Sequence, residues 1–339
     1  MTGPVLLTGG SGFLGSHIAD RLVAAGAEVR ALVRPTSDVR HLSSLPGVAL
    51  VHGALDDVPS LEAALRGVRG VIHAAGLIKA RRPDDFARVN VEGTANLLAA
   101  CRSTPGVARL VHVSSLAALG PSLDGCPRPP DAPPGPVTQY GRSKLGAEAL
   151  VRSAAGDLCT VVIRPPVVHG PRDRETLAFY LAVQLGVLPL TGPADSVLSM
   201  VYATDCADAC VRALDAELAS GSAFDVEDGR PETLATIVGH IEAAMGRRVW
   251  LRVPIPGPAL LLAAAVVEGL GRIARRPVML TRDKVKELRA PHWVCDGSAA
   301  RRELGWTPRT TFAEGARHAV AWYREAGWLS PGRVAQASL

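Results

Sequence analysis

The first residues of the chain carry the feature that most constrains its fold: a short apolar run, a glycine-rich turn and an amphipathic segment, in that order. Val5 to Thr8 is apolar enough for a buried strand, and Ile18 and Leu22 repeat at helical spacing. Between them the chain has the pattern G-x-x-G-x-x-G, with its glycines at Gly9, Gly12 and Gly15. Glycines permit a tight turn and a close approach to a pyrophosphate, which then lies at the positive end of the helix. Because the strand before the turn and the helix after it are both present, the pattern predicts a dinucleotide-binding turn.

Candidate strands and helices alternate through the first half of the chain. Such alternation predicts an α/β protein with a doubly wound parallel sheet, covered by helices on both faces. The expected strands are Val5 to Thr8, Glu28 to Arg34, Val48 to Val51, Gly70 to Ala75, Leu110 to Ser114 and Thr160 to Arg164. The segment from Ala87 to Cys101 has the apolar spacing of a buried helix.

Tyr140 and Lys144 lie four residues apart, which places a phenol and an ammonium on one face of a predicted helix. A cation nearby favours the phenolate, and we expect it to pull the phenol pKa from about 10 toward the working pH, where proton transfer is most efficient. The pattern Tyr-x-x-x-Lys also recurs by chance, and a tyrosine covering the core beside a solvated lysine is the alternative. The dinucleotide turn upstream favours the catalytic interpretation.

A proline-rich segment separates Ser115 from Tyr140 and is predicted to be a loop, because it can form neither a helix nor an inner strand. Its prolines are Pro121, Pro127, Pro129, Pro130, Pro133, Pro134 and Pro136. Ligands of open α/β sheets bind beyond the carboxyl ends of the strands. We therefore expect this loop to border the site and shape its entrance.

Six motifs follow one another as in the extended short-chain dehydrogenase/reductase superfamily, also called the epimerase/dehydratase family, which the chain resembles. They are Thr8 to Gly15, Val71 to Gly76, Asn90 to Thr94, Val113 to Ser115, Tyr140 to Lys144 and Arg164 to Pro166. Trp293 to Asp296 and Leu304 to Pro308 are similar to that family's C-terminal segments. The resemblance implies a Rossmann-type dinucleotide-binding domain over residues 1–165. It further implies a smaller α/β substrate-binding domain with interleaved pieces over residues 166–330, and a tail at 331–339.

The resemblance also implies catalytic roles. Ser115 would hydrogen-bond the substrate oxygen, Tyr140 would give or take its proton, and Lys144 would lower the phenol pKa and hold the nicotinamide ribose. Asn90 matches a position that supports the lysine through a water, and a helix residue with only local hydrogen bonds is the alternative. Ser115 is preferred to Ser114 because successive strand side chains point to opposite faces and because of the family's spacing to the tyrosine.

The expected cofactor-binding residues lie in the same motifs. They are Gly9, Ser11, Gly12, Phe13, Leu14, Gly15, Arg34, Ala54, Leu55, Ala74, Ala75, Gly76, Val113, Tyr140, Lys144, Pro165, Val167 and Val168. At the end of the second strand, enzymes that prefer NAD place an acidic residue, whereas this chain has Arg34. A guanidinium suits a 2′-phosphate, so we predict NADP, with NAD as the alternative. The family's Gly-Asp-Leu segment reads Gly-Ala-Leu-Asp at 53–56, so its carboxylate is absent or displaced to Asp56.

The substrate is predicted from two departures from the sugar-nucleotide members of the family. These carry an Asn after the sixth strand and an Arg before a Val-x-x-x-Asp motif, where this chain reads Arg164 to Val167 and Leu198 to Asp205. The missing diphosphate clamp favours the branch that resembles 3β-hydroxysteroid dehydrogenases and dihydroflavonol reductases, which act on apolar ketones or alcohols. The expected substrate residues are Ser115, Pro166 and His169, and a core or loop histidine is an equal alternative for His169.

Three functions therefore stay open. We expect an NADP(H)-dependent oxidoreductase that reduces the ketone, or oxidises the secondary alcohol, of an apolar small molecule. The alternatives are a nucleotide-sugar epimerase or dehydratase and a non-catalytic NAD(P)-binding sensor. The family resemblance also predicts a homodimer formed through the helices near Ala87 to Cys101 and Tyr140 to Ala155.

Composition agrees with a globular protein. The chain has 339 residues, of which 47% are hydrophobic and 20% charged, enough to bury a large core. Its net charge of +5 does not indicate nucleic acid, because the arginine pairs are scattered and only 4% of residues are aromatic. Six cysteines without a C-x-x-C pair or a secretory signal predict reduced thiols and a cytoplasmic location. Cys206 and Cys210 are expected to pack in a helix, with no metal site.

Residues 258–276 form the most apolar segment of the chain. Nine apolar residues from Ala259 to Val267 precede Glu268 and a basic tail. That is far short of the ~20 residues that a membrane span needs. A buried helix is the first expectation, and an interfacial helix or one lining a pocket for an apolar substrate is the alternative. Further helices are expected near Thr204 to Ala219, Thr233 to Met245 and Phe312 to Ala326.

Overall fold

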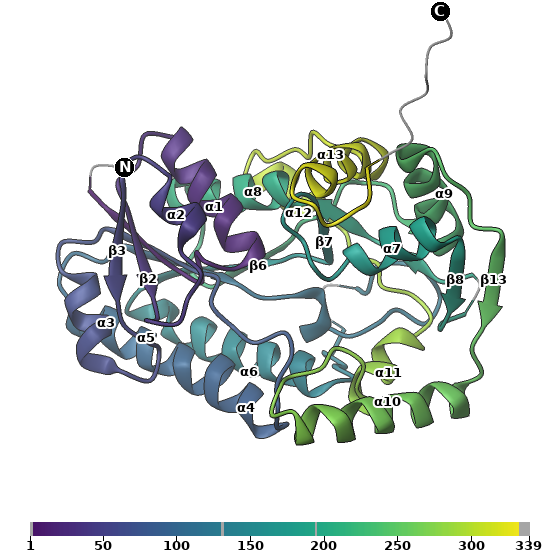
Figure 1. Ribbon diagram of the computed structural model, residues 1–339. Helices are drawn as coiled ribbons and strands as arrows, with labels where there is room; N and C mark the ends of the chain where they lie inside the picture. The colour runs from purple at the N-terminus through teal and green to yellow at the C-terminus, as the bar shows by residue number, and fades with distance from the viewer. Residues whose placement is uncertain (1–2, 130–131, 194, 332–339) are drawn as a thin grey trace, which may run out of the picture.

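A seven-stranded parallel sheet forms the centre of the protein (Figure 1). The computed structural model describes residues 3–129, 132–193 and 195–331. The strand order is β11-β6-β5-β4-β1-β2-β3, and every neighbouring pair is parallel. The strands are β1 Val5–Thr8, β2 Val29–Val33, β3 Val48–His52, β4 Gly70–His73, β5 Arg109–Val113, β6 Cys159–Arg164 and β11 Ser222–Asp225. The doubly wound fold predicted from the sequence is confirmed.

The sequence pattern located six of these strands to within two residues at each end and missed β11. β11 reads Ser-Ala-Phe-Asp, which lacks the β-branched residues that indicate a strand. It pairs with β6 through Ser222 opposite Val161 and thereby extends the sheet with residues from the second half of the chain.

Helices cover both faces of the sheet and bury its alternating side chains. On one face, Val5 and Leu7 pack with α1 (Phe13–Ala24) and α8 (Ala203–Asp215). On the other face, Leu6 packs with helices α3 Val58–Leu65, α5 Gly93–Ser103 and α6 Gln139–Ser153. Figure 1 shows these two helix layers above and below the strands. Burial on both faces explains why the strands are nearly continuous apolar runs.

α8 and β11 belong to the second half of the chain and yet pack with the first sheet. Cys206 and Cys210 of α8 are fully buried in that core, as helix packing predicts. Among the described residues no group of His, Cys, Asp or Glu is arranged to hold a metal ion.

The remaining elements form a smaller second region with its own core. Its strands pair as β7 Val167–His169 with β10 Met200–Tyr202, β8 Val187–Leu190 with β13 Leu251–Pro254, and β9 Val197–Leu198 with β12 Glu232–Thr233. Its helices are α7 Leu177–Leu185, α9 Leu234–Met245, α10 Gly257–Ile273, α11 Arg282–Leu288 and α13 Phe312–Glu325, whereas α12 Ser298–Glu303 packs on β11 in the core of the central sheet. Short helical elements complete the chain at α2 Arg40–Ser43, α4 Asp84–Phe86, η1 Ala87–Glu92, η2 Leu116–Ala118 and η3 Ala154–Gly156. The tail predicted at 331–339 lies outside the described residues beyond Pro331.

α10 does not lie in the core, so the first expectation for residues 258–276 is wrong. Leu262, Val266, Leu270 and Ile273 are 68%, 55%, 61% and 82% exposed. The helix runs along the lower edge of the molecule in Figure 1 and packs against α11 on one side only. One-sided packing leaves the other face of an apolar helix uncovered. None of the described helices is long and apolar enough to cross a membrane.

Candidate active site

The turn between β1 and α1 brings backbone, and not side chains, to the carboxyl end of the sheet. Gly9 has a φ of +77°, and a Cβ there would lie 2.6 Å from the backbone nitrogen of Ala75. A Cβ on Gly15 would lie 2.0 Å from the carbonyl oxygen of Gly9. No side chain caps α1 at Gly12, and no acidic residue lies in its first turn. The positive end of this helix is therefore free to face an anion.

A cavity of about 330 Å³, here called the cofactor cavity, opens above this turn. Of the predicted cofactor residues, those that line it are Gly9, Ser11, Gly12, Arg34, Ala54, Leu55, Ala74, Ala75 and Gly76. Those that do not line it are Phe13, Leu14, Gly15, Val113, Tyr140, Lys144, Pro165, Val167 and Val168. Lining residues that the sequence did not assign to the cofactor are Thr8, Leu32, Ser37, Gly53, Asp56, Leu77, Arg88, Val89 and Gly93. A glycine-framed cavity at a helix N-terminus fits the pyrophosphate of a dinucleotide.

The far wall of the cofactor cavity is set by the segment after β2. Arg34 is exposed, and its guanidinium makes no ion pair or hydrogen bond within the described ranges. Its backbone N–H donates to the Ser37 hydroxyl at 3.1 Å, which turns the chain so that both residues line the cavity. The wall also carries the Asp56 carboxylate, in the place suggested for the displaced acidic contact.

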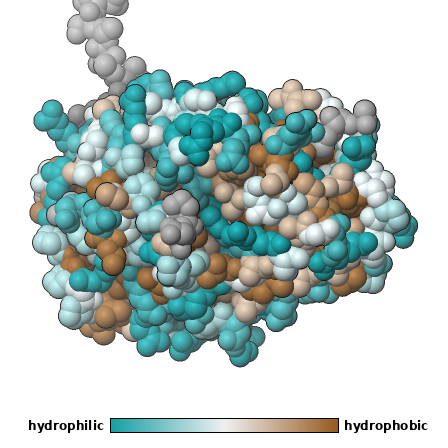
Figure 2. Space-filling view, turned by 180° about the vertical axis from the view of Figure 1, so that it is seen from behind, coloured by the Kyte–Doolittle hydropathy of each residue, from teal (hydrophilic) through white to brown (hydrophobic). Residues whose placement is uncertain are grey.

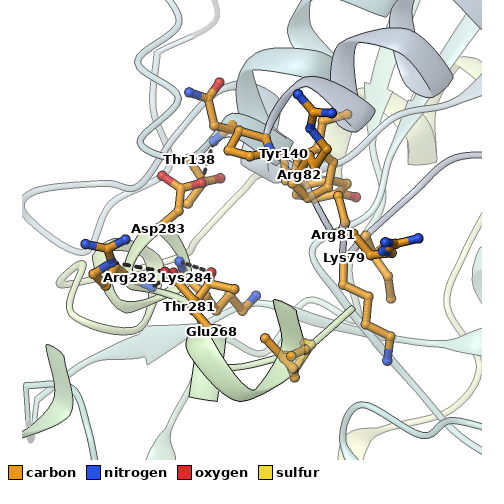
Figure 3. Close-up of a pocket in the computed structure, with 18 of the residues that line it drawn as sticks. Lys79, Arg81, Arg82, Thr138, Tyr140, Glu268, Thr281, Arg282, Asp283 and Lys284 are labelled. Carbon is orange, nitrogen blue, oxygen red and sulfur yellow. Dashed lines mark hydrogen bonds and ion pairs between the residues drawn. The ribbon is translucent and has the colours of Figure 1, made fainter. Parts of the chain in front are cut away.

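A second cavity of about 480 Å³, here called the substrate cavity, has Tyr140 in its wall. It lies between the segment after β4 and the α10–α11 hairpin. Figure 3 shows Lys79, Arg81 and Arg82 on one side and Asp283, Arg282 and Lys284 across the hollow. Apolar contacts come from Ile78, Ala80, Pro83, Phe86, Val278 and Met279. The cavity thus combines an apolar lining with a rim of charged side chains.

Ser115, Tyr140 and Lys144 meet where the two cavities approach each other. The Ser115 side chain lies close enough to the Tyr140 phenol to lower its pKa, and Tyr140 lies in the wall of the substrate cavity. Lys144 is buried, its Nζ donates to the Val113 carbonyl at 2.7 Å, and a Cβ on Gly76 in the cofactor cavity would lie 3.7 Å from that Nζ. Ser114 points away and donates to the buried carboxylate of Glu148. The alternation expected along this strand therefore places Ser115, and not Ser114, beside the tyrosine.

The pKa of the tyrosine shifts opposite to the predicted direction. Burial raises the pKa of Tyr140 to about 12, the Ser115 side chain lowers it, and the carboxylate of Glu287 raises it further. Burial also lowers the pKa of Lys144 to about 8, against the effect of Glu148. The net shift of the Tyr140 pKa is therefore upward and not downward as expected, because burial, the largest cause, outweighs the effect of Ser115.

Asn90 makes hydrogen bonds well beyond its own helix. Its Oδ1 accepts from the backbone N–H of Leu77 at 2.7 Å, and its Nδ2 donates to the Leu77 carbonyl at 3.0 Å. Nδ2 also donates to the Ser143 hydroxyl at 2.9 Å. It lies in the π-helical turn η1, a distortion that often accompanies a functional site. Asn90 therefore joins the β4 loop, which runs from one cavity to the other, to the helix that carries Tyr140.

The structure does not bring His169 into either cavity. It is fully buried between the rings of Phe312 and Tyr202, with centroids 4.6 and 5.6 Å away, and neither of its ring nitrogens has a hydrogen-bond partner. A Cβ on Gly315 of α13 would come within 2.4 Å of its Cε1. Burial accordingly lowers the pKa of His169 to about 3. Pro166 is only partly buried and also lines neither cavity.

The comparisons with known proteins agree with this geometry. Residues 5–226 match the model of the NAD dependent epimerase/dehydratase family. The chain is 33% identical to the ceramide reductase of Caulobacter vibrioides over 336 residues, 98% of each protein. It is 30% identical to the 2-alkyl-3-oxoalkanoate reductase of Stenotrophomonas maltophilia, covering 94% of this chain and 98% of the relative. The crystal structure of Thermus thermophilus UDP-glucose 4-epimerase with NAD superposes with a TM-score of 0.76 at 27% identity, over 95% of this chain and 99% of that one.

The protein belongs to the NAD-dependent epimerase/dehydratase family, within the extended short-chain dehydrogenases/reductases. It is an NAD(P)-dependent oxidoreductase, as its named reductase relatives indicate. The non-catalytic sensor considered from the sequence is thereby set aside.

Proposed function

We propose that the protein is an NADP(H)-dependent reductase of a ketone carried by an apolar small molecule. The observation that carries the proposal is the meeting of Ser115, Tyr140 and Lys144 between a cofactor cavity and a partly apolar substrate cavity. The relatives named above include reductases of a ceramide and of a 2-alkyl-3-oxoalkanoate. A cavity with six apolar lining residues beside the tyrosine suits an apolar substrate.

The residues of the site supply the proton of a reduction. Bound NADPH supplies the hydride that reduces the carbonyl carbon. With a pKa of about 12, the Tyr140 phenol is protonated at neutral pH and holds the proton that the new alkoxide takes up. Ser115, which lies beside the same phenol, is placed to donate to the carbonyl oxygen. A protonated phenol favours the reductive direction, because alcohol oxidation would begin from phenolate.

Lys144 and Asn90 support this proton transfer. The buried Lys144 ammonium would stabilise the phenolate that Tyr140 becomes when it gives up its proton. The ammonium is held in place by the hydrogen bond that it donates to the Val113 carbonyl. Asn90 acts as a positioning residue through its hydrogen bonds to Leu77 and Ser143. Ser143 in turn donates to the Tyr140 carbonyl at 2.7 Å, which ties the start of α6 to the β4 loop.

The preference for NADP over NAD rests on Arg34. Its guanidinium is exposed, unpaired within the part of the chain described and borders the cofactor cavity beside the Ser37 hydroxyl. A fork of charge-assisted donors matches a phosphate better than it matches free ribose hydroxyls. We also propose a homodimer through α5 and α6, on the family resemblance, and light scattering would test it.

Tyr140→Phe tests the proposed chemistry. This variant is expected to lower kcat with a suitable ketone by a factor of about 10²–10⁴, because it removes only the transferable proton. Cofactor binding, followed by the fluorescence of NADPH, should be unchanged. Tyr180→Phe is the matched control, since the buried Tyr180 hydroxyl has no hydrogen-bond partner and lines neither cavity. Full activity of Tyr140→Phe would refute the assignment.

A nucleotide-sugar epimerase remains a second candidate because of the rim of the substrate cavity. Arg81, Arg82 and Arg276 line the cavity and form no ion pair within the described residues, so they are free to face a diphosphate. Thermal unfolding with and without UDP-glucose separates the two functions. Protection by the nucleotide sugar would favour epimerisation, whereas its absence together with reduction of an apolar ketone would favour the reductase.

A further inference from the structure

The solvent face of α10 is apolar over almost the whole helix. α10 has 17 residues from Gly257 to Ile273, and its buried side consists of Leu260, Ala264 and Gly271. On the opposite side, Leu261, Leu262, Val266, Leu270 and Ile273 are between 44% and 82% exposed. At 100° per residue, these side chains spread over half of the helix circumference. Figure 2 shows apolar surface reaching the lower edge of the molecule, along which α10 runs in Figure 1.

The charges of α10 are arranged so that the apolar face carries no carboxylate. Glu268 is its only acidic residue, and it is turned inward, where it accepts hydrogen bonds from the backbone and guanidinium of Arg282. The cationic side chains gather at the C-terminal end, where Arg272, Arg275 and Arg276 are exposed. An exposed apolar face that ends in arginines is complementary to a surface that is both apolar and anionic.

The same end of α10 forms part of the substrate cavity. Gly271, Arg272 and Arg276 line it, and Val278 and Met279 of the following segment line it as well. The exposed apolar face and the wall of the cavity thus meet at one place on the molecule. A partner covering this face would lie directly beside the cavity that holds Tyr140.

We propose that α10 lies in the headgroup region of an anionic lipid bilayer and sets the substrate cavity at the membrane surface. The helix is about 26 Å long at 1.5 Å per residue and lies on the protein's surface, which suits an orientation in the plane of the bilayer. Leucine, valine and isoleucine side chains enter the apolar boundary, and the three arginines bind lipid phosphates. An apolar substrate then passes from the bilayer to the cavity without crossing water. A second copy of the chain is the competing occupant of this face.

Sedimentation with lipid vesicles tests the proposal on the full chain. The vesicles contain equal amounts of phosphatidylglycerol and phosphatidylcholine, and vesicles of phosphatidylcholine alone serve for comparison. The α10 variant combines Leu262→Gln, Val266→Gln, Leu270→Gln and Ile273→Gln, none of which lines either cavity. The matched control combines Leu123→Gln and Leu185→Gln, which replace leucines that are 82% and 71% exposed elsewhere on the surface.

The wild type and the control are expected to sediment with the anionic vesicles, and the α10 variant to bind them about tenfold or more weakly. A second variant, Arg275→Gln with Arg276→Gln, should lose the preference for anionic over neutral vesicles, as should the wild type at high salt. Thermal unfolding and NADPH binding show that each variant is folded, and neither readout depends on the proposed ketone chemistry.

Three results would overturn the proposal. The first is wild-type protein that stays in the supernatant with anionic vesicles at low salt. The second is an α10 variant that sediments as the wild type does. The third is a dimer, measured by light scattering, that dissociates in the α10 variant, because α10 would then be an interface between two copies of the chain. A loss of ketone reduction in Tyr140→Phe has no bearing on any of these outcomes.

Discussion

The two cavities are built in different ways, although they lie side by side. The cofactor cavity draws its walls from one continuous half of the sheet, between residues 8 and 93, and glycines and backbone make up much of its surface. The substrate cavity draws on three separate segments, at 78–86, 138–140 and 268–287, and long charged side chains make up its rim. Backbone shape is set locally, whereas a wall made of distant side chains depends on how whole helices pack. Ligand binding in the cofactor cavity should therefore be sensitive to the addition of a single atom. Binding in the substrate cavity should depend on the charge and the burial of its side chains.

The largest effect is expected from a single methyl group in the glycine turn that frames the cofactor cavity. Gly15→Ala places a Cβ 2.0 Å from the Gly9 carbonyl, which forces the turn open. We expect NADPH binding to be lost and the free energy of unfolding to fall by about 1–3 kcal/mol or more. Gly239→Ala in α9 is the control, because no atom lies within 4 Å of its new Cβ. Thermal unfolding with and without NADPH measures both effects, and a Gly15→Ala protein that binds NADPH normally would contradict the backbone origin of this cavity.

A smaller effect is expected at Arg34 in the wall of the cofactor cavity. Arg34→Ser removes the guanidinium that we assign to the 2′-phosphate, so NADPH affinity should fall about 10- to 100-fold, as for the loss of a charge-assisted hydrogen bond. NADH lacks that phosphate, and its affinity should change little. Arg40→Ser, at an exposed arginine already paired with Asp38, is the matched control. Equal losses for NADPH and NADH would show that Arg34 does not select the cofactor.

The third prediction concerns the group that lies between the cavities. Burial lowers the pKa of Lys144 to about 8, so the ammonium is present below that pH and is lost as the pH rises through it. The kcat of ketone reduction should be level below pH 8 and fall about tenfold per pH unit above it. Lys144→Arg stays charged, so its kcat should not fall above pH 8, although this kcat should be lower than that of the wild type below pH 8. A wild-type profile that stays level well above pH 8 would contradict the role given to the ammonium.

The last prediction concerns His169, which lies outside both cavities and should affect stability but not substrate binding. Its pKa of about 3 lies below the unfolded value of 6.5, so between these two pH values the imidazole is protonated in the unfolded chain and neutral in the folded protein. Stability is therefore lost as the pH falls from 6.5 toward 3, by about 1.4 kcal/mol per pH unit for this residue. His169→Leu should reduce that slope in urea unfolding and leave the KM for substrate unchanged. A raised KM would show that His169 contributes to substrate binding.

Sequence reasoning was most successful where neighbours in the chain are also neighbours in space. The β1 turn and the positions of six strands along the chain follow from local spacing and apolar patterns. β11 was missed because its four residues become a strand only beside β6. The alternative given for residues 258–276, a helix that lines a substrate pocket, anticipated part of the wall of the substrate cavity. Residues 278–287 were missed because they reach Tyr140 only through tertiary packing.

The amino-acid sequence by itself determined the family, the sheet and the dinucleotide turn, because each depends on backbone geometry that a few adjacent residues impose. Only the tertiary structure decided that α10 turns its leucines outward, that His169 lies in the core and that the pKa of Tyr140 rises. Exposure and pKa depend on which distant atoms replace water around a side chain, and chain order does not specify those atoms.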